Sequence, residues 1–262
     1  EVHLLLEPAP RGSGLTFASA CSTDQLDLNW QRLVLTHLAE REHPGVLTGS
    51  PITDMKITLI AGRAHDKHTE GGDFRQATYR AVRQGLMQAE SILLEPWYDF
   101  RLEVPSAQIG RAMSDLERMG GRYDPPAAVG EEAVLTGSAP VAALRDYPRQ
   151  VAAYTRGLGR LQYSPGGYRP CADQQAVAAA LAYDPERDAA NPADSVFCDH
   201  GSGTVVDWRK VPAMAHVDSG LRLDAPIRQQ SGPPAPRSAP ASGLAGEKEL
   251  MSIFEQTYGK VE

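Results

Sequence analysis

One polar loop gathers two imidazoles, a carboxylate, a lysine and a hydroxyl within five residues: His65, Asp66, Lys67, His68 and Thr69. Lys67 can meet a phosphate as a point charge. His65 and His68 can stack on exposed bases or hydrogen-bond to them. The loop is therefore a candidate RNA contact. A solvated connector is the plainer interpretation, because loops are polar in most proteins.

A second candidate is the turn Arg11-Gly12-Ser13-Gly14. It is too short for a phosphate-binding loop, and no helix follows it directly, so it does not have the form of a nucleotide cradle. We interpret it as a hairpin turn in which Arg11 and Ser13 add a contact to RNA.

Cysteine and histidine suggest a third kind of chemistry. Cys198 and His200, with the distant Cys171, could supply three zinc ligands. A structural zinc site needs a fourth ligand and the chain has no C-x₂-C pair, so we expect small buried cysteines instead. A zinc-dependent or hydrolytic enzyme that uses Cys198 and His200 remains the alternative function.

Two other arrangements are weaker. No G-x-S-x-G sequence follows a strand, so a serine nucleophile has no support. Arg75, Arg80 and Arg83 share a predicted helix and could form a basic face for RNA, although such charges are more often solvated.

The whole chain sets the frame for these candidates. Its 262 residues predict two domains. The three cysteines are odd in number and widely spaced, which does not indicate a disulfide framework. We therefore expect the protein to reside in the reducing cytoplasm. No apolar run is long enough to span a membrane, and a net charge of −7 argues against wrapping DNA. The chain opens inside a strand-like run without a signal peptide, so we expect a piece of a longer protein.

The first domain, residues 1–91, is predicted to be α+β. Val2 to Glu7 and Leu15 to Ala18 would form a hairpin. A helix would follow, capped by Asp24, and then a strand whose apolar residues alternate. Asp73 would cap the last helix.

The second domain, residues 92–168, shows the order β-α-β-β-α-β, which predicts a ferredoxin-like fold. Residues 98 to 104 alternate apolar and polar side chains and form its first strand. Pro148 should kink or split the helix over residues 141–155. Pro165-Gly166-Gly167 should end the final strand.

The rest of the chain is less regular. Residues 169–217 form an extension with a short helix over 174–181 and two strands within 195–206. Residues 218–246 are rich in Pro, Ser, Ala and Gly and predict a flexible linker, and residues 247–262 predict a terminal helix. A scaffold whose Pro-rich tail recruits a partner is a further alternative.

Several segments together resemble the translational GTPase elongation factor G. Gly12-Ser13-Gly14-Leu15-Thr16-Phe17 resembles the opening of its fourth domain, and Ile52 to Leu59 resembles a later strand of that domain. Leu93-Leu94-Glu95-Pro96 is similar to the hinge into the fifth domain. Leu93 to Tyr98 and Arg145-Asp146-Tyr147 are also similar to the tetracycline-resistance ribosomal protection proteins. The resemblance covers residues 1 to about 170.

The resemblance implies an α+β chain with a ribosomal protein S5 domain 2-like domain followed by a ferredoxin-like domain. It implies that the bacterial ribosome and its RNA are the partners, together with an N-terminal GTPase domain of the same protein. GTP and Mg²⁺ would belong to that domain, because this chain has no G-x-x-x-x-G-K-[ST] loop. We therefore expect no cofactor and no catalysis here.

Two expectations depend on the same resemblance. The His65–Thr69 loop occupies the position of the tip that reaches the decoding centre. Protection proteins carry an apolar Pro-Val pair there, so this polar tip is closer to elongation factor G. The extension should return to pack on the first domain, and the residues expected to be buried are Val196, Phe197, Val205, Val206 and Trp208.

Overall fold

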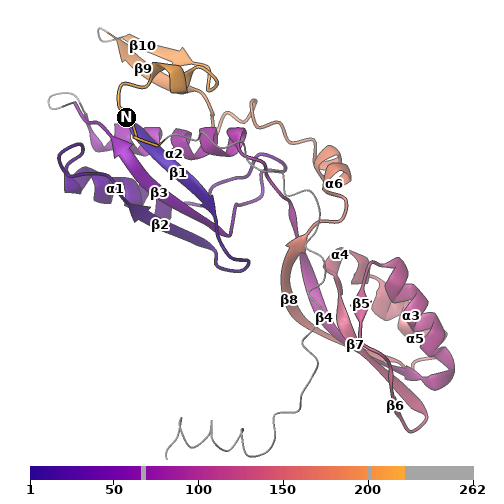
Figure 1. Cartoon of the computed structure of the whole chain (residues 1–262). Coiled ribbons are helices and arrows are strands. Elements are labelled where there is room, and N and C mark those ends of the chain that lie inside the picture. Colours follow the sequence, from indigo (N-terminus) through magenta and orange to yellow (C-terminus); the bar gives the residue numbers. More distant parts are fainter. Residues whose placement is uncertain (66–68, 200–201, 222–262) are drawn as a thin grey trace, which may run out of the picture. The chain divides into compact units, whose positions relative to one another are not determined.

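The computed structural model describes residues 1–65, 69–199 and 202–221. The first part of this chain holds β1 (Val2–Pro8), β2 (Leu15–Ser19), α1 (Leu28–Ala39), β3 (Met55–Gly62) and α2 (Gly71–Gln88) (Figure 1). The predicted terminal helix and all but the first residues of the predicted linker lie outside the described residues.

Three strands make the first sheet, in the order β1-β3-β2, so the predicted hairpin is wrong. β3 lies between β1 and β2, antiparallel to the first and parallel to the second. Ile57, Leu59 and Ala61 of β3 are fully buried. Because β3 is the central strand, its backbone forms hydrogen bonds with a neighbouring strand on each side. The segment joining β1 to β2 wraps around the start of β3, where Ala9 N donates to Asp54 O at 2.8 Å.

Helices α1 and α2 cover one face of this sheet (Figure 1). Trp30 of α1 stacks on Phe74 of α2 with ring centroids 4.8 Å apart. The core between helices and sheet is formed by apolar side chains that are almost completely buried: Val34, Leu38, Ile57, Leu59, Phe74, Val82 and Leu86. Truncating one of the largest of them, Phe74, to alanine would cost about 3–5 kcal/mol.

Carboxylates fix both helix starts, although not as predicted. Asp27, and not Asp24, caps α1, because its side chain accepts a hydrogen bond from Asn29 N at 2.8 Å. Glu70 is the N-cap residue of α2. Asp73 lies three positions into that helix and accepts from Glu70 N at 2.9 Å, which completes a capping box.

The second domain follows the predicted β-α-β-β-α-β order. Its elements are β4 (Leu94–Pro105), η1 (Ser106–Gln108), α3 (Ile109–Arg118), β5 (Arg122–Tyr123), β6 (Ala127–Val129), β7 (Glu132–Pro140), α4 (Val141–Leu144), α5 (Tyr147–Tyr154) and β8 (Arg160–Pro170). The antiparallel sheet has the order β5-β7-β4-β8, with β6 paired to β7. This is the ferredoxin-like arrangement, so the α+β fold class is confirmed.

Alternation along β4 builds the second core. The side chains of Phe100, Leu102 and Val104 are only 4%, 0% and 1% exposed, and they pack against α3 and α5. The predicted split of the second helical stretch is confirmed, since α4 ends at Leu144 and Pro148 lies in the first turn of α5. Proline fits that position because a first-turn N–H has no partner within the helix.

The Pro165-Gly166-Gly167 sequence does not end β8, contrary to the prediction. β8 runs on to Pro170, and the register against β4 shifts between Pro96 and Tyr98. Gly167 takes φ +79°, and a Cβ on Gly166 would lie 2.9 Å from Asp99 N. The glycines therefore form a β-bulge that lets the pairing continue.

The extension holds α6 (Gln174–Leu181), β9 (Ser195–Asp199), β10 (Ser202–Val206) and η2 (Val211–Met214). Val206 is buried, and Phe197 and Trp208 are half-buried. Val196 and Val205 are 49% and 68% exposed, so the expectation that they are buried is wrong. They face each other across the β9–β10 pair and so share one face of it, opposite the face that carries Val206.

Candidate nucleic-acid interface

The predicted tip loop leaves the end of β3 and returns at the start of α2. Its outer residues close on each other: His65 N donates to Thr69 Oγ1 at 2.6 Å, and Thr69 N donates to His65 O at 3.1 Å. Asp66, Lys67 and His68 lie outside the described residues.

The start of α2 does not itself attract anions. Free N–H groups and the helix dipole normally make such an end positive. Here Glu70 and Asp73 supply carboxylates at that end, and Asp73 already accepts from Glu70 N. Any attraction of this loop for RNA phosphate has to come from its basic residues.

The other predicted contact lies at the opposite end of β3. Gly14 O accepts from Met55 N, the first residue of β3, at 3.0 Å, whereas the tip loop follows the last residue, Gly62. Eight strand residues separate the two ends by roughly 25 Å. The structure therefore does not bring Arg11 and Ser13 together with the tip loop.

Asp54, which was not among the residues predicted from the sequence, organises the Arg11–Gly14 turn. The backbone N–H of Gly12 is the largest cause that lowers the pKa of this carboxyl. Gly14 N donates to Asp54 Oδ1 at 3.1 Å, and the Arg11 guanidinium lies 3.9 Å from Oδ2. Arg11 remains 48% exposed, while the exposed Ser13 donates its N–H to Pro10 O at 3.1 Å. An acidic residue directly before an apolar strand was the available signal.

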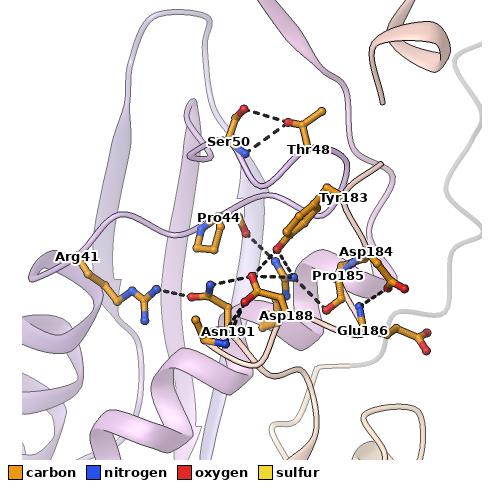
Figure 2. A network of polar contacts seen from close by, with 12 residues as sticks. Arg41, Pro44, Thr48, Ser50, Tyr183, Asp184, Pro185, Glu186, Asp188 and Asn191 are labelled. Atoms are coloured by element: carbon orange, nitrogen blue, oxygen red, sulfur yellow. Dashed lines mark hydrogen bonds and ion pairs between the residues drawn. The ribbon is translucent and has the colours of Figure 1, made fainter. Parts of the chain in front are cut away.

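The possible basic face of α2 is not formed. Arg83 is 3% exposed and points inward, where it donates to Pro44 O, Tyr183 Oη and Pro185 O. Arg75 is exposed and lies 3.2 Å from Glu40 Oε1. The residues around Tyr183 and Asp188 cover this part of α2 and supply the acceptors (Figure 2).

The cysteines do not assemble a metal site within the described part of the chain, where no group of three His, Cys, Asp or Glu residues has a suitable arrangement. Cys171 is half-buried directly after β8, and Cys198 is exposed on β9, so the expectation that both cysteines are buried is wrong. His200 lies outside the described residues. The described residues also include no helix with the length and apolar character needed to cross a bilayer.

Comparisons with known proteins give similarity over both domains. Residues 1–90 match the family model described as Elongation factor G, domain IV, and residues 92–178 match Elongation factor G C-terminus. The chain is similar to the Tetracycline resistance protein TetP of Clostridium perfringens, with 33% identity over 168 residues. That match covers 64% of this chain and 26% of the relative, so the chain spans about a quarter of the relative's length.

The fold also has a solved neighbour. A crystal structure of a protein from Thermus thermophilus matches with a TM-score of 0.62 at 24% identity. The match covers 69% of this chain and 27% of the other. At this identity the likeness supports the fold alone.

Proposed function

Since the chain belongs to the elongation factor G family, with domain IV followed by the C-terminal domain, we propose that it is the ribosome-binding part of a translational GTPase. The observation that carries the proposal is the match of both family models, in order, over nearly all of residues 1–178. The GTPase domain, with GTP and Mg²⁺, belongs to another part of the same protein, and this part acts in the bacterial cytoplasm without catalysis of its own.

The proposed RNA contact is the His65–Thr69 loop. Its described ends follow β3 and precede α2, and His65 N donates to Thr69 Oγ1. Lys67 would neutralise a backbone phosphate, and the imidazoles would contact bases. Arg11 and Ser13, at the other end of β3, would form a separate contact.

Co-sedimentation with bacterial ribosomes tests this proposal. The chain joined to its GTPase domain should pellet with ribosomes at low salt and dissociate as salt rises, because RNA contacts release counterions. The double variant Lys67→Ala/His68→Ala should weaken binding about tenfold, an effect of about 1.4 kcal/mol. Lys56→Ala removes a lysine charge from an exposed position on β3 and should bind like the parent. Absence of binding at low salt would reject the proposal.

A finer proposal concerns tetracycline. The similar protein from Clostridium perfringens is named for tetracycline resistance, and we propose the same ribosomal protection for the full-length parent of this chain. Expression of that parent in a susceptible bacterium should raise the inhibitory concentration of tetracycline several-fold. An unchanged inhibitory concentration, with ribosome binding intact, would assign a different translation-factor role.

A further inference from the structure

A pocket of about 140 Å³ opens between α2, the segment after α1, and residues 190–192 of the extension. We call it the α2 pocket. Its polar lining includes residues from three parts of the chain that are distant in sequence, among them Arg41, His43, Tyr79, Arg80, Arg83 and Asn191. Since residues 190–192 form one wall, the pocket exists only while the extension lies against α2.

Two of its arginines have donors with no acceptor among the described residues. Arg80 Nε and Arg83 Nε are buried and form no hydrogen bond with any described residue. Arg83 is 3% exposed, and its other nitrogens are already engaged. A buried N–H without a partner costs about 1–3 kcal/mol, so such groups normally have an acceptor.

The charge around the pocket is also unbalanced. Arg41 donates to the amide oxygen of Asn191 (Figure 2), and its guanidinium carbon lies 4.7 Å from the centroid of the Tyr79 ring. Neither contact neutralises its charge. Arg80 has no ion pair within the described part of the chain.

Among the residues that the structure describes, Asp188 is the carboxylate within 4 Å of these arginines. Asp188 Oδ2 lies 3.9 Å from Arg83, and it also accepts hydrogen bonds from Tyr183 and Asn191. Glu40 on the far side of Tyr79 is occupied by the Tyr79 hydroxyl, His37 and Arg75. Burial lowers the pKa of His43, so its ring adds no charge near neutral pH. Of the three arginines, only Arg83 therefore has a described ion pair.

We propose that the α2 pocket binds a phosphoryl oxyanion, held by the guanidinium groups of Arg41 and Arg80, which line it. Guanidinium groups bind such oxyanions through directed, charge-assisted hydrogen bonds. The volume corresponds to about four or five waters, which is room for one tetrahedral anion with part of its hydration shell. Water alone would satisfy the donors but would leave the positive charge uncompensated.

The anion can come from free phosphate or from an RNA backbone, and both offer the same oxygens. Thermal unfolding of the 262-residue chain in a phosphate-free buffer tests for either source. A ligand that binds only the folded state raises the melting temperature, and the rise grows as its concentration exceeds the dissociation constant. Inorganic phosphate should therefore raise it, relative to chloride at equal ionic strength. A short RNA oligonucleotide, in a second series, identifies a backbone phosphate as the ligand if it acts at lower phosphate concentration.

Arg80→Gln is the decisive variant, because Arg80 has no partner among the described residues and its loss should not unfold the chain. It should weaken phosphate affinity about tenfold, the loss of one charge-assisted contact. Arg75→Gln, on the same helix but exposed and paired with Glu40, should leave the affinity unchanged. The proposal is overturned if neither ligand has an effect beyond that of chloride, or if Arg80→Gln responds like the parent.

Discussion

Arg83 of α2 donates a hydrogen bond to the hydroxyl of Tyr183, 100 residues further along the chain, at 2.6 Å. The same hydroxyl donates to Asp188 Oδ2 at 2.7 Å, and the Arg83 guanidinium lies 5.6 Å from the Tyr183 ring centroid. A buried cation thus joins α2 to the extension through directed acceptors (Figure 2). Because a buried charge is stable only when its partners stay in place, this contact should control how firmly the extension is held.

Tyr183→Phe should lower the free energy of unfolding by about 1–3 kcal/mol, since it removes an acceptor from a buried charged donor. Urea unfolding followed by circular dichroism measures the change. Tyr168→Phe removes a hydroxyl from a ring that is 59% exposed and should change stability by less than about 0.5 kcal/mol. Equal effects of the two substitutions would contradict the role given to Tyr183.

Local patterns predicted the elements that depend on their own residues. The alternation of Phe100, Leu102 and Val104 identified β4, and the helix predicted over residues 174–181 has the observed bounds of α6. Those patterns arise from the periods of strand and helix, which any single segment displays.

Long-range contacts account for the errors. The apolar strand β3 lies between β1 and β2, where it is buried. The short connection between β1 and β2 predicts a hairpin and gives no sign of this arrangement. The inward direction of Arg83 depends on acceptors supplied by Pro185 and Tyr183. The bulge at Gly166 depends on its pairing partner Asp99. Each outcome is decided by a segment that a local pattern does not include.

Asp54→Asn should destabilise the Arg11–Gly14 turn by about 1 kcal/mol at neutral pH. Asparagine keeps the shape and tolerates the φ of 55° at this position, but it loses the charge that the Gly12 and Gly14 N–H groups stabilise. Because the pKa of Asp54 is lowered by folding, its contribution is present above the unfolded pKa of about 3.8 and is lost as pH falls through the folded pKa.

Urea unfolding from pH 7 to pH 3 checks this dependence. The difference between parent and Asp54→Asn should be largest near pH 7 and should shrink below about pH 4. Asp24→Asn, at an exposed position outside any helix, provides the control. A difference that does not vary with pH would exclude the charge of Asp54 as the cause.

His43 predicts a second pH dependence at higher pH. Burial is the largest cause of its lowered pKa, Arg41 adds to it, and the ring nitrogen Nε2 donates to Leu38 O at 2.9 Å. The neutral ring is favoured by folding, so its contribution is complete above the unfolded pKa of about 6.5 and declines as pH falls below it.

His43→Gln keeps a donor but cannot take up a proton in this range. The parent should therefore lose more stability than His43→Gln between about pH 6.5 and pH 5, measured by urea unfolding at each pH. Parallel curves for the parent and His43→Gln would count against a buried neutral His43.

Gly166→Ala should weaken the β4–β8 pairing by about 1–3 kcal/mol, the usual cost of inserting a methyl group where there is no room. The added Cβ would lie 2.9 Å from both Asp99 N and Asp99 Oδ1, and backbone cannot move aside without breaking the pairing of Asp99 with Ser164. Gly110→Ala is the matched control, because no heavy atom lies within 4 Å of its new methyl group and α3 should gain about 0.5–1 kcal/mol. Chemical unfolding should move the two variants in opposite directions from the parent. If Gly166→Ala were as stable as Gly110→Ala, the close approach at the bulge would be wrong, and β8 would have to pair with β4 in another register.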